Sequence, residues 1–160
     1  KKIPSLGICL GMQMAVIEFA RHVLDLRDAN TSELDPNTTY PVIDLMPDQN
    51  LQNLGHTMRL GKYRCALLPG TNSYQAYGQD EIEERHRHRY EFNNEYMTRF
   101  IAGGMTVAGR NPERNLVEIV EIADHPWFVG VQFHPELKSR PNRPHPLFRD
   151  FVGAALKHGE

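Results

Sequence analysis

The spacing of apolar residues predicts a strand followed by a long helix at the start of the chain. Residues 3–8 form a short apolar segment, which is typical of a buried strand. Beyond Gly11, apolar residues recur at three- and four-residue spacing, and this pattern predicts an amphipathic helix over residues 11–26. Residues 28–41 are polar and contain several Asn, Asp and Pro residues, so we expect a loop there.

The middle of the chain predicts strands and turns. Residues 42–46 suit a short strand, and residues 57–60 and 63–68 flank Gly61-Lys62 like the two arms of a hairpin. Residues 69–79 carry Pro, Gly and Asn, which are typical of turns. Residues 83–92 alternate in an unusual way, because a strand there would present a different set of side chains on each face. The two sets are Arg85, Arg87 and Arg89, and His86, His88 and Tyr90.

A short helix and three strands are predicted next. Asn93 or Asn94 is a suitable N-cap for a helix that runs to Ala102, and the glycine pair that follows ends it. Three further segments are rich in β-branched and aromatic residues and therefore predict strands. They are residues 105–109, 116–122 and 128–133.

The chain ends in a second amphipathic helix, which completes the predicted architecture. Pro146 suits the first turn of this helix. Its apolar stripe consists of Leu147, Phe151, Ala154 and Ala155. Helices and strands alternate at both ends of the chain around a β-rich middle, so we predict an α/β domain with three layers.

Composition narrows the class of protein. The 160 residues suffice for one domain with a sizeable core, and 40% hydrophobic with 24% charged residues is ordinary for a globular protein. A net charge of −2 gives no reason to expect a nucleic acid or a membrane surface as partner. No long apolar stretch or signal peptide is evident, so we expect no transmembrane span. The two cysteines do not form a disulfide framework, which favours a cytoplasmic setting.

Cys9 is the first candidate for chemistry. It lies in the pattern G-x-C-x-G, after a predicted strand and before a predicted helix, which is the layout of a nucleophile elbow with cysteine in place of serine. A thiol at a helix N-terminus meets the positive end of the helix dipole, which favours the thiolate. Cys65, in contrast, lies inside a predicted strand and is expected to serve packing alone.

The second candidate is the segment 131–136, Val-Gln-Phe-His-Pro-Glu. In an extended segment His134 and Glu136 project to the same face, and Pro135 favours the extended conformation for His134. A histidine that accepts the thiol proton and a carboxylate that orients the histidine would complete a Cys-His-Glu triad.

These residues resemble a known family. Residues 7–13 (GICLGMQ) and 132–136 (QFHPE) together resemble the class I, triad-type glutamine amidotransferases. Three further segments narrow the resemblance to the glutaminase domains of CTP synthases, and the Arg-His run in the last of them is the most specific element. The segments are residues 28–33 (DANTSE), 57–61 (TMRLG) and 84–91 (ERHRHRYE).

The resemblance implies a fold and a reaction. The fold is the three-layer, flavodoxin-like α/β fold of class I glutamine amidotransferases. In CTP synthases the glutaminase domain hydrolyses glutamine, and the released ammonia passes to a separate amidoligase domain that aminates UTP to CTP with ATP.

The resemblance also implies roles for individual residues. Cys9 matches the nucleophile that forms a glutamyl thioester, His134 matches the base, and Glu136 matches the carboxylate that orients the base. Glu33 matches an acidic residue that holds the ammonium group of glutamine, and Arg89 matches a basic residue at the same site. The segment that lines the glutamine site is matched by Leu10, Gly11, Met12 and Gln13.

The extent of the chain shapes these expectations. It begins with Lys1 and enters a strand almost at once, so we expect residues 1–160 to be the C-terminal part of an amidotransferase domain whose fold is incomplete at its N-terminal side. In the family an upstream glycine-rich loop contributes to the oxyanion hole, which leaves the Leu10 N–H as the candidate donor here. We expect the amidoligase domain, and with it ATP and Mg, to be missing, and therefore expect no cofactor and no metal in this chain.

The resemblance further implies the partners of the chain. They are L-glutamine as ligand, the amidoligase domain of the same parent chain, and further copies of a homo-oligomeric parent.

Several alternatives stay open at this level. The triad also fits another class I amidotransferase or a γ-glutamyl hydrolase-like cysteine hydrolase, and the chain would then lack the link to UTP. The basic run at residues 85–89 suggests a nucleic-acid-binding module, although glutamates flank it and no aromatic stacking platform accompanies it. His86 and His88 share a face and suggest a metal site. Finally, the chain is also consistent with a catalytically dead fragment.

Overall fold

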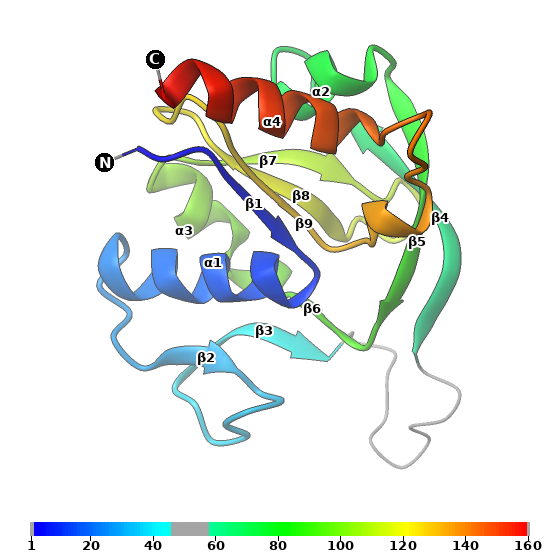
Figure 1. The fold of residues 1–160 in the computed structure, drawn as a ribbon. Helices are drawn as coiled ribbons and strands as arrows, with labels where there is room; N and C mark the ends of the chain where they lie inside the picture. Colours follow the sequence, from blue (N-terminus) through cyan, green and yellow to red (C-terminus); the bar gives the residue numbers. More distant parts are fainter. Residues whose placement is uncertain (1, 46–57, 160) are drawn as a thin grey trace.

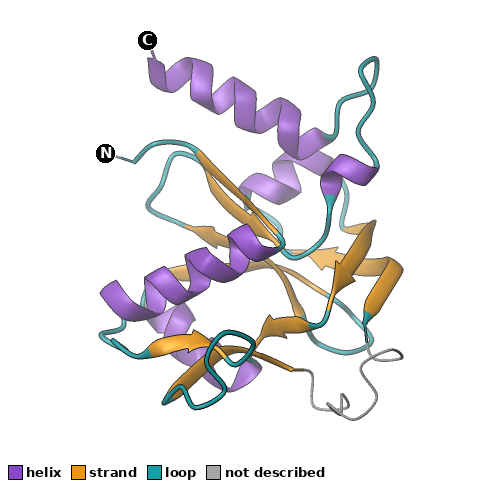
Figure 2. Cartoon of the chain, turned by 60° about the horizontal axis from the view of Figure 1, so that its bottom comes forward, coloured by secondary structure: helices purple, strands orange, loops and turns teal. Residues whose placement is uncertain are grey.

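The computed structural model describes residues 2–45 and 58–159, and these form three layers (Figures 1 and 2). A six-stranded sheet lies in the middle. Helices α1 (Leu10–His22) and α3 (Met97–Ala102) cover one face, and helices α2 (Asn72–Tyr77) and α4 (Pro146–Gly159) cover the other. The predicted three-layer α/β architecture is confirmed.

The central sheet is mixed, with a single parallel pair at one edge. Its strands in spatial order are β1 (Ser5–Ile8), β9 (Phe128–Val131), β8 (Val117–Ile122), β7 (Met105–Arg110), β4 (Arg59–Leu67) and β5 (Glu81–His88). Strands β1 and β9 are parallel and the other neighbours are antiparallel. The carboxyl ends of β1 and β9 therefore meet at the same edge, where sites form in α/β folds.

A second, three-stranded sheet lies beyond α1. It consists of β2 (Ala29–Thr31), β3 (Tyr40–Leu45) and β6 (Tyr90–Phe92). Helix α1 contacts both sheets, so it is buried on two sides and carries Met12, Val16 and Ala20 in the core at 0% exposure. One hydrophobic cluster fills the space around α1 and α3, and another fills the space under α2 and α4.

Burial along the strands follows their place in the sheet. Strands β8 and β9 are covered on both faces and are buried almost continuously, whereas β5 alternates strictly between exposed and buried residues. The predicted alternation therefore holds for residues 85–88. It ends at Arg89, where the chain leaves the central sheet and enters β6 of the second sheet.

Three local predictions are wrong. Gly61-Lys62 is not a hairpin turn: β4 runs through it, and Gly61 at φ 103° pairs with His86 of β5. The predicted loop 28–41 contains β2, which pairs in parallel with β3. The predicted turns at 69–79 enclose α2, which Thr71 caps by accepting a hydrogen bond from the Tyr74 N–H. Met46 and Thr57, at the ends of two predicted segments, lie outside the described residues.

Other predictions are confirmed with shifted ends. Helix α1 ends at His22 rather than at residue 26, because the chain turns at Asp25, whose φ is 54°. Asn93 caps a 3-10 turn, η2 (Asn94–Tyr96), by accepting a hydrogen bond from the Glu95 N–H, and α3 follows. None of the helices in the described part of the chain combines the length and the hydrophobicity needed to cross a membrane.

Candidate active site

Cys9 occupies a strained position between β1 and α1. Its φ of 50° lies in the left-handed region, which costs a non-glycine residue free energy and is common at functional sites. The turn is held by the Cys9 N–H, which donates to the Val131 oxygen at 2.7 Å. A Cβ on Gly7 would lie 2.8 Å from the backbone carbon of Gly11, so only glycine permits this close approach of strand and helix. The predicted nucleophile elbow is therefore present.

The electrostatic environment of the Cys9 thiol differs from the prediction. Burial raises the pKa of Cys9, and the nearby carboxylates of Glu136 and Glu33 raise it further. Hydrogen bonds from the Leu10 N–H and from the Gln132 side chain lower it. The helix terminus does favour the thiolate through Leu10, but burial outweighs this effect and the net pKa is raised.

His134 and Glu136 form the expected pair. His134 Nδ1 and Glu136 Oε1 are 2.6 Å apart, and the His134 backbone N–H donates to the Arg85 oxygen at 2.8 Å. The segment is not extended as predicted: Pro135 begins a 3-10 turn, η3 (Pro135–Leu137), and this turn brings the carboxylate back onto the imidazole. His134 Nε2 is buried and has no hydrogen-bond partner among the described residues.

The sheet brings the two halves of the site to one edge. Ile8 of β1 pairs with Val131 of β9, so Cys9 and Gln132 directly follow neighbouring parallel strands. The Gln132 side-chain nitrogen lies 3.7 Å from the Cys9 sulfur. The described contacts include no direct hydrogen bond between Cys9 and His134, and the triad geometry between these two residues stays a prediction.

The residues predicted to bind glutamine separate into two groups. Leu10 and Gly11 are exposed at the start of α1, whereas the side chains of Met12 and Gln13 are buried, at 0% and 3% exposure. The side chain of Met12 packs in the core around α1, so any contact of Met12 with a ligand requires its backbone.

Glu33 and Arg89 both affect the pKa of Tyr90. Glu33 is exposed in the turn after β2, and Arg89 is partly buried between β5 and β6. The Glu33 carboxylate raises the pKa of Tyr90 and the Arg89 guanidinium lowers it, after the larger raising effect of burial. The Glu33 carboxylate also raises the pKa of the Cys9 thiol, and a shared pocket for Glu33 and Arg89 beside Cys9 stays a prediction.

The sequence did not identify Gln132 and Tyr90 as site residues. Gln13 Nε2 donates to the Tyr90 oxygen at 2.9 Å and to Gln132 Oε1 at 3.2 Å. Gln132 lies inside the same six-residue motif as His134, and this was the only signal for it in the sequence.

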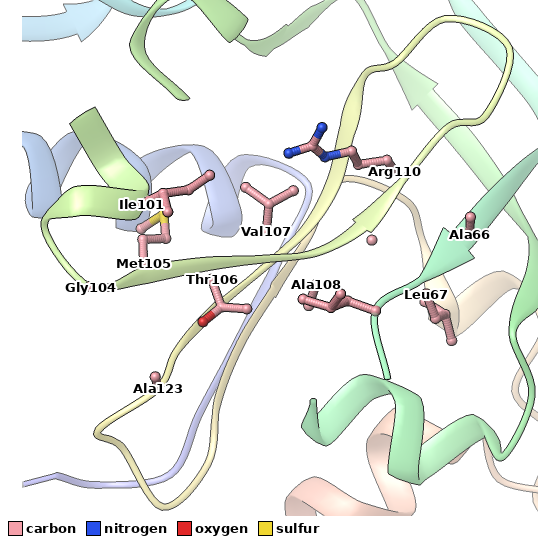
Figure 3. Close-up of a pocket in the computed structure, with 12 residues that line it drawn as sticks. Ala66, Leu67, Ile101, Gly104, Met105, Thr106, Val107, Ala108, Arg110 and Ala123 are labelled. Atoms are coloured by element: carbon pink, nitrogen blue, oxygen red, sulfur yellow. The ribbon is translucent and has the colours of Figure 1, made fainter. Parts of the chain in front are cut away.

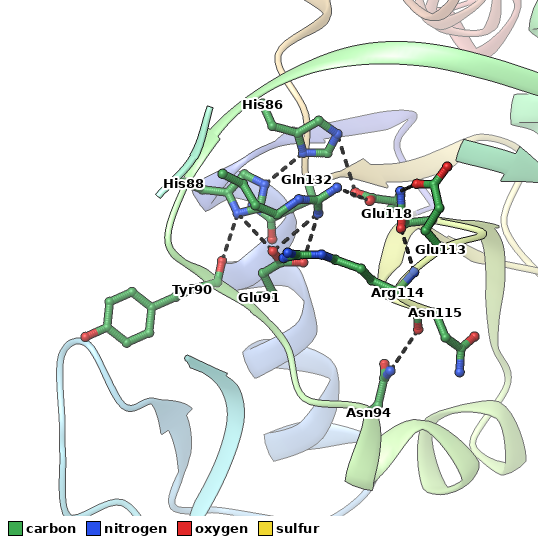
Figure 4. Close-up of polar contacts among 12 residues, drawn as sticks. His86, His88, Tyr90, Glu91, Asn94, Glu113, Arg114, Asn115, Glu118 and Gln132 are labelled. Carbon is green, nitrogen blue, oxygen red and sulfur yellow. Dashed lines mark hydrogen bonds and ion pairs between the residues drawn. The ribbon is translucent and has the colours of Figure 1, made fainter. Parts of the chain in front are cut away.

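A second polar cluster, which we call the sealed cluster, lies inside the protein (Figure 4). It consists of Arg59, His86, His88, Glu91 and Glu118, all of them buried. Arg59 donates to Glu91 at 3.0 Å and to Glu118 at 2.7 Å. Nδ1 of His86 and Nε2 of His88 are 2.8 Å apart, which is hydrogen-bond distance.

Burial controls the proton affinity of this cluster. It lowers the pKa of His86 to about 2 and that of His88 to about 3, and it raises the pKa of Glu91 to about 8. His86 and His88 therefore serve as packed neutral histidines. Within residues 2–45 and 58–159, no three His, Cys, Asp or Glu side chains are placed to hold a metal ion.

An apolar pocket of about 560 Å³ lies away from Cys9 (Figure 3). Ile101 of α3 and residues 104–110 around β7 line much of it, and Arg110 is the one ionisable residue in its wall. The pocket offers no acid, base or nucleophile and is not a candidate for the reaction.

Comparisons with known proteins agree with this geometry. Residues 1–154 match the family model described as glutamine amidotransferase class-I. The chain is 64% identical over 156 residues to a CTP synthase of Moorella thermoacetica and 65% identical over 155 residues to one of Clostridium acetobutylicum. These matches cover 97% and 96% of this chain, but only 29% of the length of each relative.

A solved structure is similar as well. The glutaminase domain of Trypanosoma brucei CTPS with bound acivicin superposes with a TM-score of 0.91 at 35% identity. The match covers 98% of this chain and 61% of that one. With most of its length matched by the family model and its fold shared with this glutaminase domain, the chain belongs to the class I glutamine amidotransferase family.

Proposed function

We propose that this chain hydrolyses L-glutamine through a thioester on Cys9 and supplies the ammonia for the ATP-dependent amination of UTP to CTP. One observation carries the proposal. A strained, partly buried cysteine and a Glu-oriented histidine with an unpartnered, buried Nε2 follow two adjacent parallel strands at one sheet edge.

The chemistry follows from the protonation state of His134. The short contact between Nδ1 and Glu136 favours a proton on Nδ1, which leaves Nε2 as the base. Nε2 accepts the Cys9 proton, and the sulfur attacks the side-chain carboxamide carbon of glutamine. The Leu10 N–H is the candidate donor to the oxyanion. The same imidazole returns the proton to the leaving nitrogen, so ammonia departs and a glutamyl thioester remains.

The thioester is then hydrolysed. A water attacks the thioester carbonyl while His134 accepts its proton, and the sulfur leaves with that proton to regenerate the thiol and release glutamate. Glu33 and Arg89 are proposed to bind the ammonium and the carboxylate of glutamine, because a zwitterion requires one partner of each charge.

The remaining parts of the reaction are assigned to the rest of a longer protein. The chain spans about 29% of the length of the curated CTP synthases it matches. An amidoligase domain in the remainder would bind UTP, ATP and Mg, and it is the proposed recipient of the ammonia.

The test compares two nitrogen donors in the longer protein that carries this chain. Cys9→Ala should abolish CTP formation with glutamine and spare CTP formation with ammonium chloride, because free ammonia bypasses the thioester. Cys65→Ala is the matched control, since Cys65 is fully buried in the core and should leave both activities intact. Equal loss of both activities in Cys9→Ala would refute the proposal. Glutamine hydrolysis without any CTP formation by the unmutated protein would instead favour a simple γ-glutamyl hydrolase.

A further inference from the structure

A buried amide lies next to the candidate nucleophile. Gln132 is 0% exposed, and its side-chain nitrogen is 3.7 Å from the Cys9 sulfur. Its backbone N–H donates to the Glu118 oxygen at 2.9 Å, which fixes the main chain at this point. A buried amide in a fixed position has its orientation determined by the partners within its reach.

Gln13 determines which end of the Gln132 amide faces the sulfur. The Tyr90 carbonyl can only accept, so the Gln13 atom 2.9 Å from it must be the amide nitrogen. The same nitrogen lies 3.2 Å from Gln132, which must therefore present its oxygen to Gln13 and its nitrogen to Cys9. The Tyr90 carbonyl thus fixes the orientation of the Gln13 amide, and the Gln13 amide in turn fixes the orientation of the Gln132 amide. We call this set of hydrogen-bonded groups the relay.

The thiolate has a physical need for such a donor. Cys9 faces the carboxylates of Glu136 from η3 and Glu33 from the turn after β2, and both disfavour a negative charge on the sulfur. His134 faces the same edge through its unpartnered Nε2. The hydrogen bonds that oppose the carboxylates come from the Leu10 N–H and from Gln132.

We propose that Gln132 stabilises the Cys9 thiolate through an N–H···S hydrogen bond, and that Gln13 is the positioning residue that keeps this N–H directed at the sulfur. This inference rests on the proposed role of Cys9 as nucleophile. It also gives the buried side chain of Gln13 a role that does not require contact with the substrate.

The test measures the acidity of the thiol without any substrate. Cys9 is alkylated with iodoacetamide across a pH series, and its modification is followed by mass spectrometry of the Cys9 peptide. Cys65 is fully buried and serves as an internal unreactive control while the protein stays folded. Gln132→Met keeps the side-chain length and removes the donor. An N–H···S bond of ordinary net strength predicts a rate about 3- to 10-fold lower at pH 7, with an unchanged plateau at high pH.

Further variants separate this role from simple packing. Gln13→Met should shift the profile in the same direction by a smaller amount, because Gln132 keeps its donor but loses the bond that orients it. Gln132→Glu should shift it at least as far as Gln132→Met, because a carboxylate replaces the donor. Gln75→Met is the matched control on α2 in the opposite layer and should leave the profile unchanged.

The outcomes are decisive for the inference. Profiles of Gln132→Met and Gln13→Met that superimpose on the wild type, in folded protein, would overturn it. If Gln132→Met does not fold, Gln132→Glu and Gln13→Met still decide the question. Because alkylation requires no glutamine, a shifted profile in a protein that does not hydrolyse glutamine would refute the proposed function and leave this inference intact.

Discussion

The candidate active site and the sealed cluster are built from similar side chains but differ in access to solvent. At the sheet edge, His134 is 22% exposed and keeps Nε2 without a partner among the described residues. In the sealed cluster, His86 is 0% exposed, contacts His88 and lies 3.6 Å from Glu118. Nε2 of His86 is likewise buried without a hydrogen-bond partner among the described residues, so the two histidines differ in the exposure of the ring and in the carboxylate that contacts Nδ1 of His134.

This difference shows how burial assigns roles to residues that look alike in the sequence. The histidines of the sealed cluster lie in the most specific family motif, yet burial lowers their pKa values far below neutral pH. They cannot exchange protons near neutrality and instead connect β5 to the Arg59 ion pairs. Composition and spacing alone do not separate the two cases, because the separation depends on the partners supplied by β8 and η3.

The largest expected effect is on glutamine turnover, and it distinguishes the candidate active site from the sealed cluster. His134→Gln removes the base and should lower glutamine turnover by about 100- to 10,000-fold, with a small change in stability. His86→Gln is the matched substitution in the sealed cluster. It should lower the free energy of unfolding by about 1–3 kcal/mol and leave turnover within a few-fold. Steady-state glutaminase assays and denaturant unfolding of both variants check this; the opposite assignment of effects would break the comparison.

The next effect concerns the charge inside the sealed cluster. Arg59→Met leaves the buried acidic side chains of Glu91 and Glu118 without their cationic hydrogen-bond donor, which should cost about 3–5 kcal/mol of stability. Arg64→Met on the same strand is the control, because Arg64 pairs with Glu81 and Glu113 at the solvent-exposed surface and should change stability little. Urea unfolding measures both values, and equal losses would show that burial of the Arg59 pairs is unimportant.

The pH dependence of stability follows from the lowered pKa values of His86 and His88. Below pH 6.5 the unfolded chain binds protons at these histidines, while the folded protein does not until about pH 2–3. Their contribution is thus complete above pH 6.5 and is lost as pH falls, by at most about 1.4 kcal/mol per pH unit for each histidine. Glu91, with its raised pKa, has the opposite sign: its contribution is lost as pH rises toward 8.

A variant isolates the histidine contribution. The double variant His86→Gln, His88→Gln should show a shallower decline of unfolding free energy between pH 6.5 and 4 than the wild type. Parallel pH profiles of the two proteins would mean that these histidines do not remain neutral inside the fold.

The smallest expected effect is on the KM for glutamine, and it tests the position of Arg89 at the candidate active site. Arg89→Ala should raise the KM for glutamine about 10-fold with little change in kcat, since a carboxylate partner contributes binding shared by ground and transition states. Arg87→Ala removes the same charge from an exposed position two residues earlier and should change neither constant. An unchanged KM in Arg89→Ala would remove Arg89 from the glutamine site.

Much of the fold could be predicted from local pattern, and the failures have physical causes. The strands near residues 105–109, 116–122 and 128–133 are buried and apolar, so their sequence carries the signal. A turn was predicted at Gly61-Lys62 because two strand-like segments flank it, but Gly61 pairs with His86 of β5 at a φ of 103°, and β4 continues through it. Strand β2 has three residues and depends on its parallel partner β3, which no local pattern reveals.

The capping residues of helix α2 are visible in the sequence but were not predicted as caps. Thr71 is the N-cap and Gly78 the left-handed C-cap, and Gly78 was interpreted from the sequence as a turn residue. The buried carboxylate of Glu121 accepts hydrogen bonds from the N–H groups of Asn72 and Ser73, which stabilises the first turn from a distant strand. Such a partner cannot be found from the sequence around residue 72.

The sequence predicted the reactive residues of the candidate site but not the residues that orient them. The motif around Cys9 predicted the turn between β1 and α1, which is present, and the motif around His134 predicted its contact with Glu136, which is also present. The relay through Gln13 and Gln132, and the burial that raises the thiol pKa, depend on tertiary contacts between α1, β6 and β9.

Direct detection of the thioester tests the central claim, that Cys9 is the nucleophile served by His134. The longer protein that carries this chain is mixed with glutamine, quenched in acid within the first turnovers and digested, and the Cys9 peptide is weighed by mass spectrometry. The account predicts a glutamyl group on Cys9 in the wild type and none in Cys9→Ala or His134→Gln. Active hydrolysis of glutamine with Cys9 unmodified, or undiminished hydrolysis by Cys9→Ala, would contradict it.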